Sequence, residues 1–220
     1  TYVMDALKAQ LVKVIGRLPY FVPHWSKPLL KPFSGPLLKL YSDSYRSLYS
    51  SIKDEILVKT PMGPYIYVRY WDLVERECAI GTWERTYMNF FRSKIKKGDV
   101  VVDVGAYIGI FSLLASGLVG SSGLVYSFEP VPNSYQRLVR NLDANNAKNV
   151  RAYNLGLSDK KEKVCLAVPR EIPAEASLSR VGTWSELTKR MKLHKDMVEA
   201  ELVPFDELAK ANELREINVV

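Results

Sequence analysis

The apolar and polar positions of this 220-residue chain repeat with two different periods, which predict where helices and strands lie. Residues 4–18 carry apolar side chains at steps of three and four, which is typical of an amphipathic helix. Residues 56–60 and 65–70 alternate weakly around a Pro-Gly turn, which predicts a β-hairpin. From residue 98 onward, apolar runs of strand length are separated by helical patterns, which indicates a parallel sheet covered by helices.

The elements expected from residue 85 onward are helices and strands in a mostly alternating order. We expect helices at 85–96, 109–118, 133–144 and from 204, and strands at 100–104, 123–129, 150–155, 163–168, 198–203 and from 216. Asn133 or Ser134 can cap the helix that follows Pro132. This order predicts an α/β fold with three layers, α/β/α. The chain then divides into an extension at 1–54, a hairpin and helix at 55–97, and a core at 98–220 that is incomplete at its C-terminal end.

The stretch that organises this fold, residues 98–112, combines a buried strand, a glycine turn and the start of a helix. Its strand is apolar except for Asp103, whose carboxylate is costly to bury unless another group satisfies it. In an open α/β sheet, ligands bind beyond the carboxyl ends of the strands, where Asp103 lies. Gly105 permits a turn that a side chain would block, and Gly109 lets the next helix pack closely. A tight turn without a ligand is the plain alternative.

A second strand ends at Glu129 and is stopped by Pro130. Glu129 follows Gly109 by 20 positions, which is the spacing of the acidic residue that binds ribose in a Rossmann-like half. Its carboxylate can accept hydrogen bonds from both ribose hydroxyls. An ordinary surface acid is the alternative, but its pairing with the glycine turn favours a ligand-binding role.

The glycine pattern argues against a dinucleotide cofactor. The dinucleotide fingerprint is G-x-G-x-x-G, whereas Tyr107 and Ile110 occupy its second and third glycine positions here. A carboxylate beside the turn repels a pyrophosphate and suits the ammonium group of an amino acid. S-adenosylmethionine has such a group and no phosphates, so the chemistry favours a methyltransferase over an NAD enzyme.

Several motifs in combination resemble the FkbM-type S-adenosylmethionine-dependent methyltransferases. They are Asp103-Val-Gly-Ala-Tyr-Ile-Gly109, Phe128-Glu129-Pro130-Val-Pro132, Asn141-Leu-Asp-Ala-Asn145 and Gly156-Leu157-Ser158-Asp159, with Ile80-Gly81-Thr82-Trp83-Glu84 upstream. The resemblance covers roughly residues 55–220. The chain departs from it at Tyr107, where the family usually has asparagine. This departure concerns a side-chain contact to the methionine part and leaves the backbone turn unaffected.

The resemblance implies a Rossmann-like class I methyltransferase sheet. The helix from residue 85 would lie over the cofactor, close to Glu84, although the helix dipole explains a carboxylate at a helix start equally well. Ser158 and Asp159 would lie near the adenine and accept from its amino group, with a plain Ser-Asp turn as the alternative. The candidate cofactor-binding residues are therefore Asp103, Gly105, Ala106, Tyr107, Gly109, Glu129, Pro130, Ser158, Asp159 and Glu84.

Composition argues against several other classes of protein. Apolar residues make up 47% of the chain, which is enough for a substantial core, and Cys78 and Cys165 are too far apart to suggest a disulfide framework. His24 and His194 lie far from any cysteine pair, so no metal-ligand spacing is present. Neither a secretory signal nor an apolar run of membrane-spanning length occurs, so we expect a cytoplasmic protein.

The N-terminal residues 1–40 interleave basic and aromatic side chains with prolines, and the net charge of the chain is +7. This pattern fits an interfacial segment on a membrane. Packing of the extension on the domain or on a second copy of the chain is the favoured interpretation.

The resemblance implies O-methylation of a hydroxyl on a sugar or other small metabolite. The sequence pattern does not identify a general base for this reaction. Two alternatives stay open. An RNA methyltransferase fits the basic charge, but the basic residues are scattered and no aromatic-basic platform is present. A non-catalytic protein could keep the fold for membrane or partner docking. In the resembled family the strand from residue 216 carries an acidic motif beside the transferred methyl group, so we expect residues 1–220 alone to be poorly active.

Overall fold

The computed structural model describes residues 4–12, 47–83, 85–170, 173–178, 195–211 and 217–220. The chain divides into two compact units, one formed by Thr1–Pro61 with Tyr67–Trp83 and the other by Met62–Ile66 with Glu84–Val220. The second unit contains the glycine turn and the strand that ends at Glu129.

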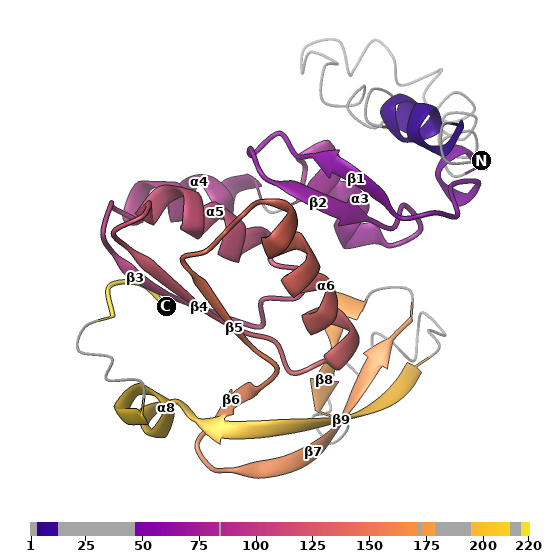
Figure 1. The fold of residues 1–220 in the computed structure, drawn as a ribbon. Helices are drawn as coiled ribbons and strands as arrows, with labels where there is room; N and C mark the ends of the chain where they lie inside the picture. Colours follow the sequence, from indigo (N-terminus) through magenta and orange to yellow (C-terminus); the bar gives the residue numbers. More distant parts are fainter. Residues whose placement is uncertain (1–3, 13–46, 84, 171–172, 179–194, 212–216) are drawn as a thin grey trace, which may run out of the picture. The chain divides into compact units, whose positions relative to one another are not determined.

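The predicted hairpin is present, since β1 (Ile56–Lys59) and β2 (Tyr65–Val68) form a two-stranded sheet (Figure 1). Every second residue of β1 is buried, as expected for a strand with one face on a core. After β2 the structure has a helix that the sequence pattern did not predict, α3 (Leu73–Ile80). Its first turn is capped by Asp72, whose side chain accepts a 3.1 Å hydrogen bond from the N–H of Glu75.

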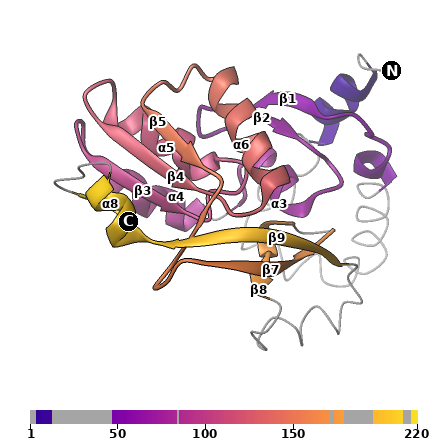
Figure 2. The same cartoon turned by 60° about the horizontal axis from the view of Figure 1, so that its bottom comes forward.

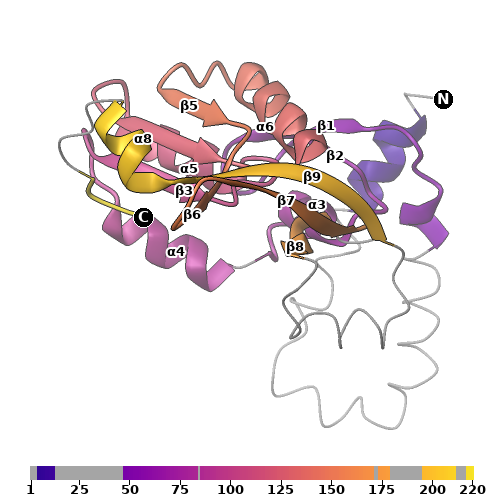
Figure 3. The ribbon, with the colours of Figure 1, turned by 90° about the horizontal axis from the view of Figure 1, so that it is seen from below.

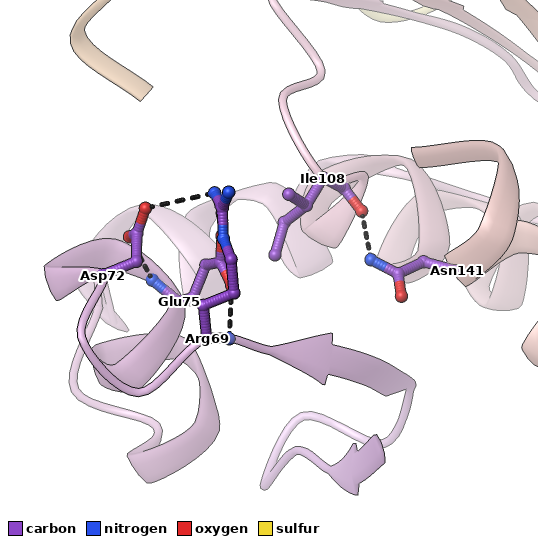
Figure 4. Close-up of polar contacts among 5 residues, drawn as sticks. All are labelled: Arg69, Asp72, Glu75, Ile108 and Asn141. Carbon is purple, nitrogen blue, oxygen red and sulfur yellow. Dashed lines mark hydrogen bonds and ion pairs between the residues drawn. The ribbon is translucent and has the colours of Figure 1, made fainter. Parts of the chain in front are cut away.

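A buried ion cluster stabilises the start of α3 (Figure 4). Arg69 donates to the Glu75 carboxylate from its backbone N–H at 2.7 Å, from Nε at 2.9 Å and from Nη2 at 2.7 Å. The same Nη2 lies 3.4 Å from Oδ2 of Asp72. Both carboxylates are fully buried, so Arg69 and the N–H groups of the first helical turn compensate their charges.

Residues 4–12 are helical as predicted, and the apolar stripe that predicted the helix is not its buried face. Ala9 and Val12 are buried, whereas the apolar stripe of Met4, Leu7 and Leu11 is exposed. The small side chain of Ala9 permits close approach, and its carbonyl accepts a 3.4 Å hydrogen bond from the hydroxyl of Tyr70. The rest of the predicted helix, residues 13–18, lies outside the described residues.

The core sheet of the second unit is parallel and has the order β3 (Val100–Val104), β4 (Leu124–Phe128), β5 (Val150–Tyr153). The connections are α5 (Ile110–Val119) and α6 (Pro132–Ala144), which confirms the predicted βαβ order (Figure 1). The predicted cap of α6 is wrong. Pro132 is the first helical residue and Val131 the N-cap, because proline suits the first helical position and its missing N–H costs nothing there.

Helices cover both faces of this sheet, as the apolar strands require. One face packs against α5 and against α4 (Arg85–Lys94) in a cluster that includes Phe91, Ile95, Val101, Ala115, Val119 and Val125. The other face packs against α8 (Phe205–Ala211) through Val102, Tyr126, Phe128, Phe205 and Leu208. Figure 3 shows α4 and α8 on opposite sides of the strands. None of the described helices is long and apolar enough to cross a membrane.

A second sheet follows, with the order β6 (Gly156–Ser158), β9 (Lys195–Pro204), β7 (Glu162–Pro169), β8 (Ser177–Leu178). The strands expected at 163–168 and 198–203 are confirmed as β7 and β9, which pair antiparallel as a curved band (Figure 2). A short 3₁₀ turn, Pro173–Glu175, precedes β8. The segment from Gly156 was expected to be a loop and is instead a strand, because it pairs parallel with the end of β9.

Candidate cofactor-binding site

The topological switch point of the core sheet lies at β3. This strand pairs with β4 on one side, while on the other side Val101 forms a parallel bridge with Val219. The N–H of Val102 donates to the carbonyl of Val219 at 2.9 Å, so Val219 pairs with β3 as the strand expected from residue 216 would. Because ligands bind beyond the carboxyl end of strands at such a point, the candidate site begins at Asp103.

The glycine turn after β3 is held by the backbone of the next strand. The N–H groups of Gly105 and Ala106 both donate to the carbonyl of Phe128, at 2.9 and 3.0 Å. The N–H of Gly109 closes the turn onto the carbonyl of Ala106 at 2.7 Å. These bonds fix the turn against the end of β4 before any side chain is considered.

Both glycines of the turn have the left-handed backbone that favours glycine, with φ of 79° at Gly105 and 88° at Gly109. A Cβ at Gly109 would lie 2.4 Å from Cδ1 of Leu138 on α6, so its absence allows the close packing that the sequence predicted. A Cβ at Gly105 would meet no atom within 4 Å. Gly105 therefore borders open space, which suits the approach of a ligand.

Tyr107 also has a positive φ, 51°, which is uncommon for a residue with a large side chain. Its side chain is largely buried, and its N–H donates a 2.8 Å hydrogen bond to Oε2 of Glu129. The unusual backbone conformation thus serves to direct this N–H at the carboxylate. The departure from asparagine at this position leaves the turn intact, as expected.

Glu129 is buried at the end of β4, and its carboxylate accepts hydrogen bonds from both the glycine turn and the segment before α6. Its second oxygen, Oε1, accepts a 2.8 Å hydrogen bond from the N–H of Val131, just before α6. Burial raises the pKa of this carboxyl, and the nearby charge of Asp103 adds to that effect, whereas the bonds from Val131 and Tyr107 oppose it. Each oxygen keeps a lone pair for a further donor.

The loop at Glu129 is held from β5 as well. Asn154, just after β5, donates from Nδ2 to the carbonyl of Glu129 at 2.8 Å and to that of Pro130 at 3.2 Å. The N–H of Glu129 donates in turn to the carbonyl of Tyr153 at 3.0 Å. Together with the bonds from Gly105 and Ala106 to Phe128, these hydrogen bonds connect the carboxyl ends of β3, β4 and β5.

The carboxylate of Asp103 is satisfied from α5, which answers the cost noted from the sequence. The hydroxyl of Ser112 donates to Oδ2 of Asp103 at 2.5 Å, and the N–H of Ser112 also donates to this carboxylate. Burial raises the pKa of Asp103, although the two bonds from Ser112 oppose the increase. Asp103 thereby also stabilises the N-terminal turn of α5.

A cavity of about 360 Å³ opens beside Asp103 and Gly105. Its other walls come from α4, from the end of β3 and from the start of α5, with Tyr87, Phe90, Phe91, Val102, Val104, Phe111 and Val220. Asp103 is the one residue with a carboxylate side chain among the described residues that line it. Tyr107 and Gly109 in the turn, and Glu129 beside it, are not among the residues that line this cavity.

The remaining candidate residues are less closely connected to the turn. Ser158 lies on β6, and its hydroxyl donates to Oδ1 of Asp159 at 3.1 Å, so an adenine contact of this pair stays a prediction. Glu84 lies outside the described residues. Within the described part of the chain, no three His, Cys, Asp or Glu side chains come together to hold a metal ion.

Sequence reasoning assigned no role to four polar residues that hold the site: Ser112, Ser127, Asn141 and Asn154. Asn141 on α6 donates from Nδ2 to the carbonyl of Ile108 at 2.8 Å and so fixes the glycine turn (Figure 4). Ser112, Ser127 and Asn141 are fully buried. The signal that could have identified the three buried residues is a polar side chain at a position that the periodicity assigns to the core.

Comparison with known proteins agrees with this geometry. Residues 103–220 match the family model described as the methyltransferase FkbM domain. The search of curated proteins found no match.

Solved methyltransferase structures are similar at low identity. The FkbM methyltransferase from Methylobacillus flagellatus KT is 14% identical, with 63% of this chain and 32% of that chain covered and a TM-score of 0.30. TYW2 from P. horikoshii in complex with MeSAdo is 19% identical, with 74% of each chain covered and a TM-score of 0.34. A putative rRNA methylase from Clostridium thermocellum is 23% identical, with 33% of this chain and 41% of that chain covered and a TM-score of 0.32. This chain thus spans less than half of the rRNA methylase.

The family model covers more than half of the chain. It begins at Asp103 and therefore includes the glycine turn, Glu129 and the carboxyl ends of β4 and β5. The parallel sheet, its order and its two helical layers are those expected of a class I methyltransferase. The chain therefore belongs to the FkbM family of S-adenosylmethionine-dependent methyltransferases.

Proposed function

We propose that this protein binds S-adenosylmethionine at the carboxyl ends of β3 and β4 and methylates a hydroxyl on a sugar or other small metabolite. The observation that carries the proposal is the position of Asp103 and Gly105 at the mouth of the cavity. There a carboxylate stands beside a glycine whose missing side chain leaves open space. This combination suits a ligand with an ammonium group and no phosphate.

The residues of the turn have separate roles in this proposal. Asp103 pairs with the ammonium group of the cofactor, and the backbone at Gly105 lies against its methionine part. Glu129 accepts from the ribose hydroxyls with the lone pairs that Tyr107 and Val131 leave free. The bound cofactor supplies an already activated methyl group, so the protein has to position the acceptor oxygen and receive its proton.

The lining of the cavity favours a small uncharged acceptor over RNA. Aromatic side chains from α4, among them Tyr87 and Phe90, form much of the wall. Asp103 would repel a phosphate placed in the same space. No arginine or lysine is among the residues that line the cavity in the described part of the chain, so a polyanionic acceptor finds no counter-charge there.

Calorimetric titration with S-adenosylmethionine and S-adenosylhomocysteine tests the cofactor part. We expect the full chain to bind both, and Asp103→Asn and Glu129→Ala to lose most of the affinity. Glu207→Ala, at an exposed position on α8, should keep it. Absence of binding by the full chain overturns the proposal. Transfer of labelled methyl to a panel of sugars and small alcohols, with total RNA as the competing acceptor, then tests the acceptor class.

We propose further that the N-terminal helix contacts membranes, because Met4, Leu7 and Leu11 expose 58%, 60% and 49% of their surface. Co-sedimentation with anionic phospholipid vesicles tests this role. Replacing all three residues by serine should reduce binding, whereas Leu57→Ser, a change of the same kind on β1, should not. Equal partitioning of the two variants contradicts the proposal.

A further inference from the structure

A chain of two hydrogen bonds runs from β4 through α5 to the carboxylate of Asp103. Ser127 is the register partner of Asp103 on the neighbouring strand. Its hydroxyl lies 2.8 Å from the hydroxyl of Ser112, which lies 2.5 Å from Oδ2 of Asp103. Both serines are fully buried, so water does not replace these contacts.

The direction of the two bonds follows from the chemistry of the groups. An ionised carboxylate only accepts, so Ser112 must donate its single hydroxyl proton to Asp103. Ser112 then has no proton left for Ser127, and Ser127 must be the donor in the second bond. Ser127 thereby removes the freedom of the Ser112 hydroxyl to rotate and leaves its proton directed at Asp103.

We propose that Ser112 and Ser127 are positioning residues for the cofactor, which hold the Asp103 carboxylate in the orientation that receives the ammonium group of S-adenosylmethionine. This inference rests on the proposed function of the site. The serines themselves do not touch the cofactor. They act by holding the carboxylate against α5 through Oδ2, while Asp103 lines the cavity.

The groups around Asp103 make this support necessary. Burial disfavours its ionised form, and the Glu129 carboxylate at the end of β4 interacts with it as a like charge. Tyr87 is the titratable group that faces the same cavity from α4, and α5 presents Ser112 with no ionisable side chain beside it. The hydroxyl and N–H of Ser112 are therefore the stabilising contacts of the charge before the ammonium group arrives.

Titration of the Asp103 carboxyl carbon by NMR, in the protein without cofactor, tests the hydrogen-bond chain directly. We expect Ser112→Ala to raise the pKa of Asp103, because the ionised form loses a donor, and Ser127→Ala to raise it less. Ser116→Ala is the matched control, since Ser116 lies one turn further along α5 and bonds to Asn149 instead. Equal titration of Asp103 in the parent and in Ser112→Ala overturns the proposal.

Calorimetry with S-adenosylhomocysteine, which keeps the ammonium group, tests the consequence for binding. We expect Ser112→Ala to weaken binding roughly tenfold at the pH where the NMR titration finds Asp103 half ionised, and to recover part of this loss as the pH rises further and Asp103 ionises. A merely structural role would lower the melting temperature without such a pH dependence, so a pH-independent loss contradicts the inference. If the parent chain binds no S-adenosylhomocysteine, the proposed function fails and the positioning role fails with it, whereas the NMR titration still decides whether the hydrogen-bond chain exists.

Discussion

The backbone N–H of Tyr107 and the side chain of Glu129 are joined by a 2.8 Å hydrogen bond between the glycine turn and the end of the neighbouring strand. Because Tyr107 has a positive φ, the bond is made by a backbone conformation that a large side chain rarely adopts. The other carboxylate oxygen of Glu129, Oε1, accepts a hydrogen bond from the N–H of Val131. One buried carboxylate thus sets the relative position of the two loops on which the cofactor would lie.

Removal of this carboxylate should destabilise the fold as well as the site. Glu129→Ala leaves the N–H groups of Tyr107 and Val131 without an acceptor, and we expect the free energy of unfolding to fall by about 3 kcal/mol. Glu129→Gln keeps one amide oxygen and should lose less. Urea denaturation measures both, with Glu207→Ala as the exposed control. A loss for Glu129→Ala no larger than that of the control would show that the two N–H groups find other partners.

The two glycines of the turn should respond differently to alanine. Gly105→Ala adds a side chain in open space and should cost about 1 kcal/mol from the positive φ alone. Gly109→Ala adds the collision with Leu138 to the same backbone cost, so we expect about 3 kcal/mol. Thermal denaturation compares the two. For cofactor affinity the order should be the opposite. Gly105→Ala should lose more affinity than Gly109→Ala, because its new methyl group borders the cavity. Equal destabilisation would contradict the packing role of Gly109.

Asn141 should support the turn from α6. Asn141→Leu fills a similar volume but leaves the buried carbonyl of Ile108 without its donor, and we expect a loss of about 2 kcal/mol in the free energy of unfolding. Asp143→Asn, an exposed change on the same helix, is the control for urea denaturation. Unchanged stability of Asn141→Leu would mean that the turn relaxes to satisfy this carbonyl in another way.

Long apolar runs and glycine turns allowed the core sheet to be predicted from the sequence. The run at β4 and the middle of the run at β3 are buried on both faces, which is typical of parallel strands covered by helices. The helix α3 was missed because Glu75 and Arg76 are buried within it, which hides its apolar face. The strand β6 was missed because it has three residues and depends on pairing with β9, which lies more than 35 positions later in the chain.

The same contrast holds for the site. Asp103, Gly109 and Glu129 follow from spacing and turn chemistry, which act over short distances along the chain. Their hydrogen-bond partners do not, because Ser112 and Asn141 reach the turn only once helices and strands have packed. The sequence reasoning also placed Glu129 only as a ligand for ribose, whereas the structure adds its bonds to two backbone N–H groups.

The raised pKa of Asp103 predicts a specific dependence of stability on pH. A carboxyl whose pKa is higher in the folded than in the unfolded chain binds more protons when folded, so its contribution to stability is present at low pH and is lost as the pH rises through the folded pKa. The ordinary value for aspartate is 3.8, which places the start of this loss near that pH. Asparagine carries no such titration and can still accept from Ser112 through its amide oxygen.

We therefore expect Asp103→Asn to gain stability relative to the parent chain as the pH rises from about 4 toward neutrality. The carboxyl of Glu129 reinforces the trend, because the charge of Asp103 also raises its pKa in the parent. Urea denaturation of both proteins across this range measures the difference, with Asp143→Asn as the exposed control. A difference that does not change with pH would mean that Asp103 ionises as readily in the folded chain as in the unfolded one. The predicted gain in stability should accompany a loss of cofactor affinity, since the charge that destabilises the empty fold is the one proposed to bind the ammonium group.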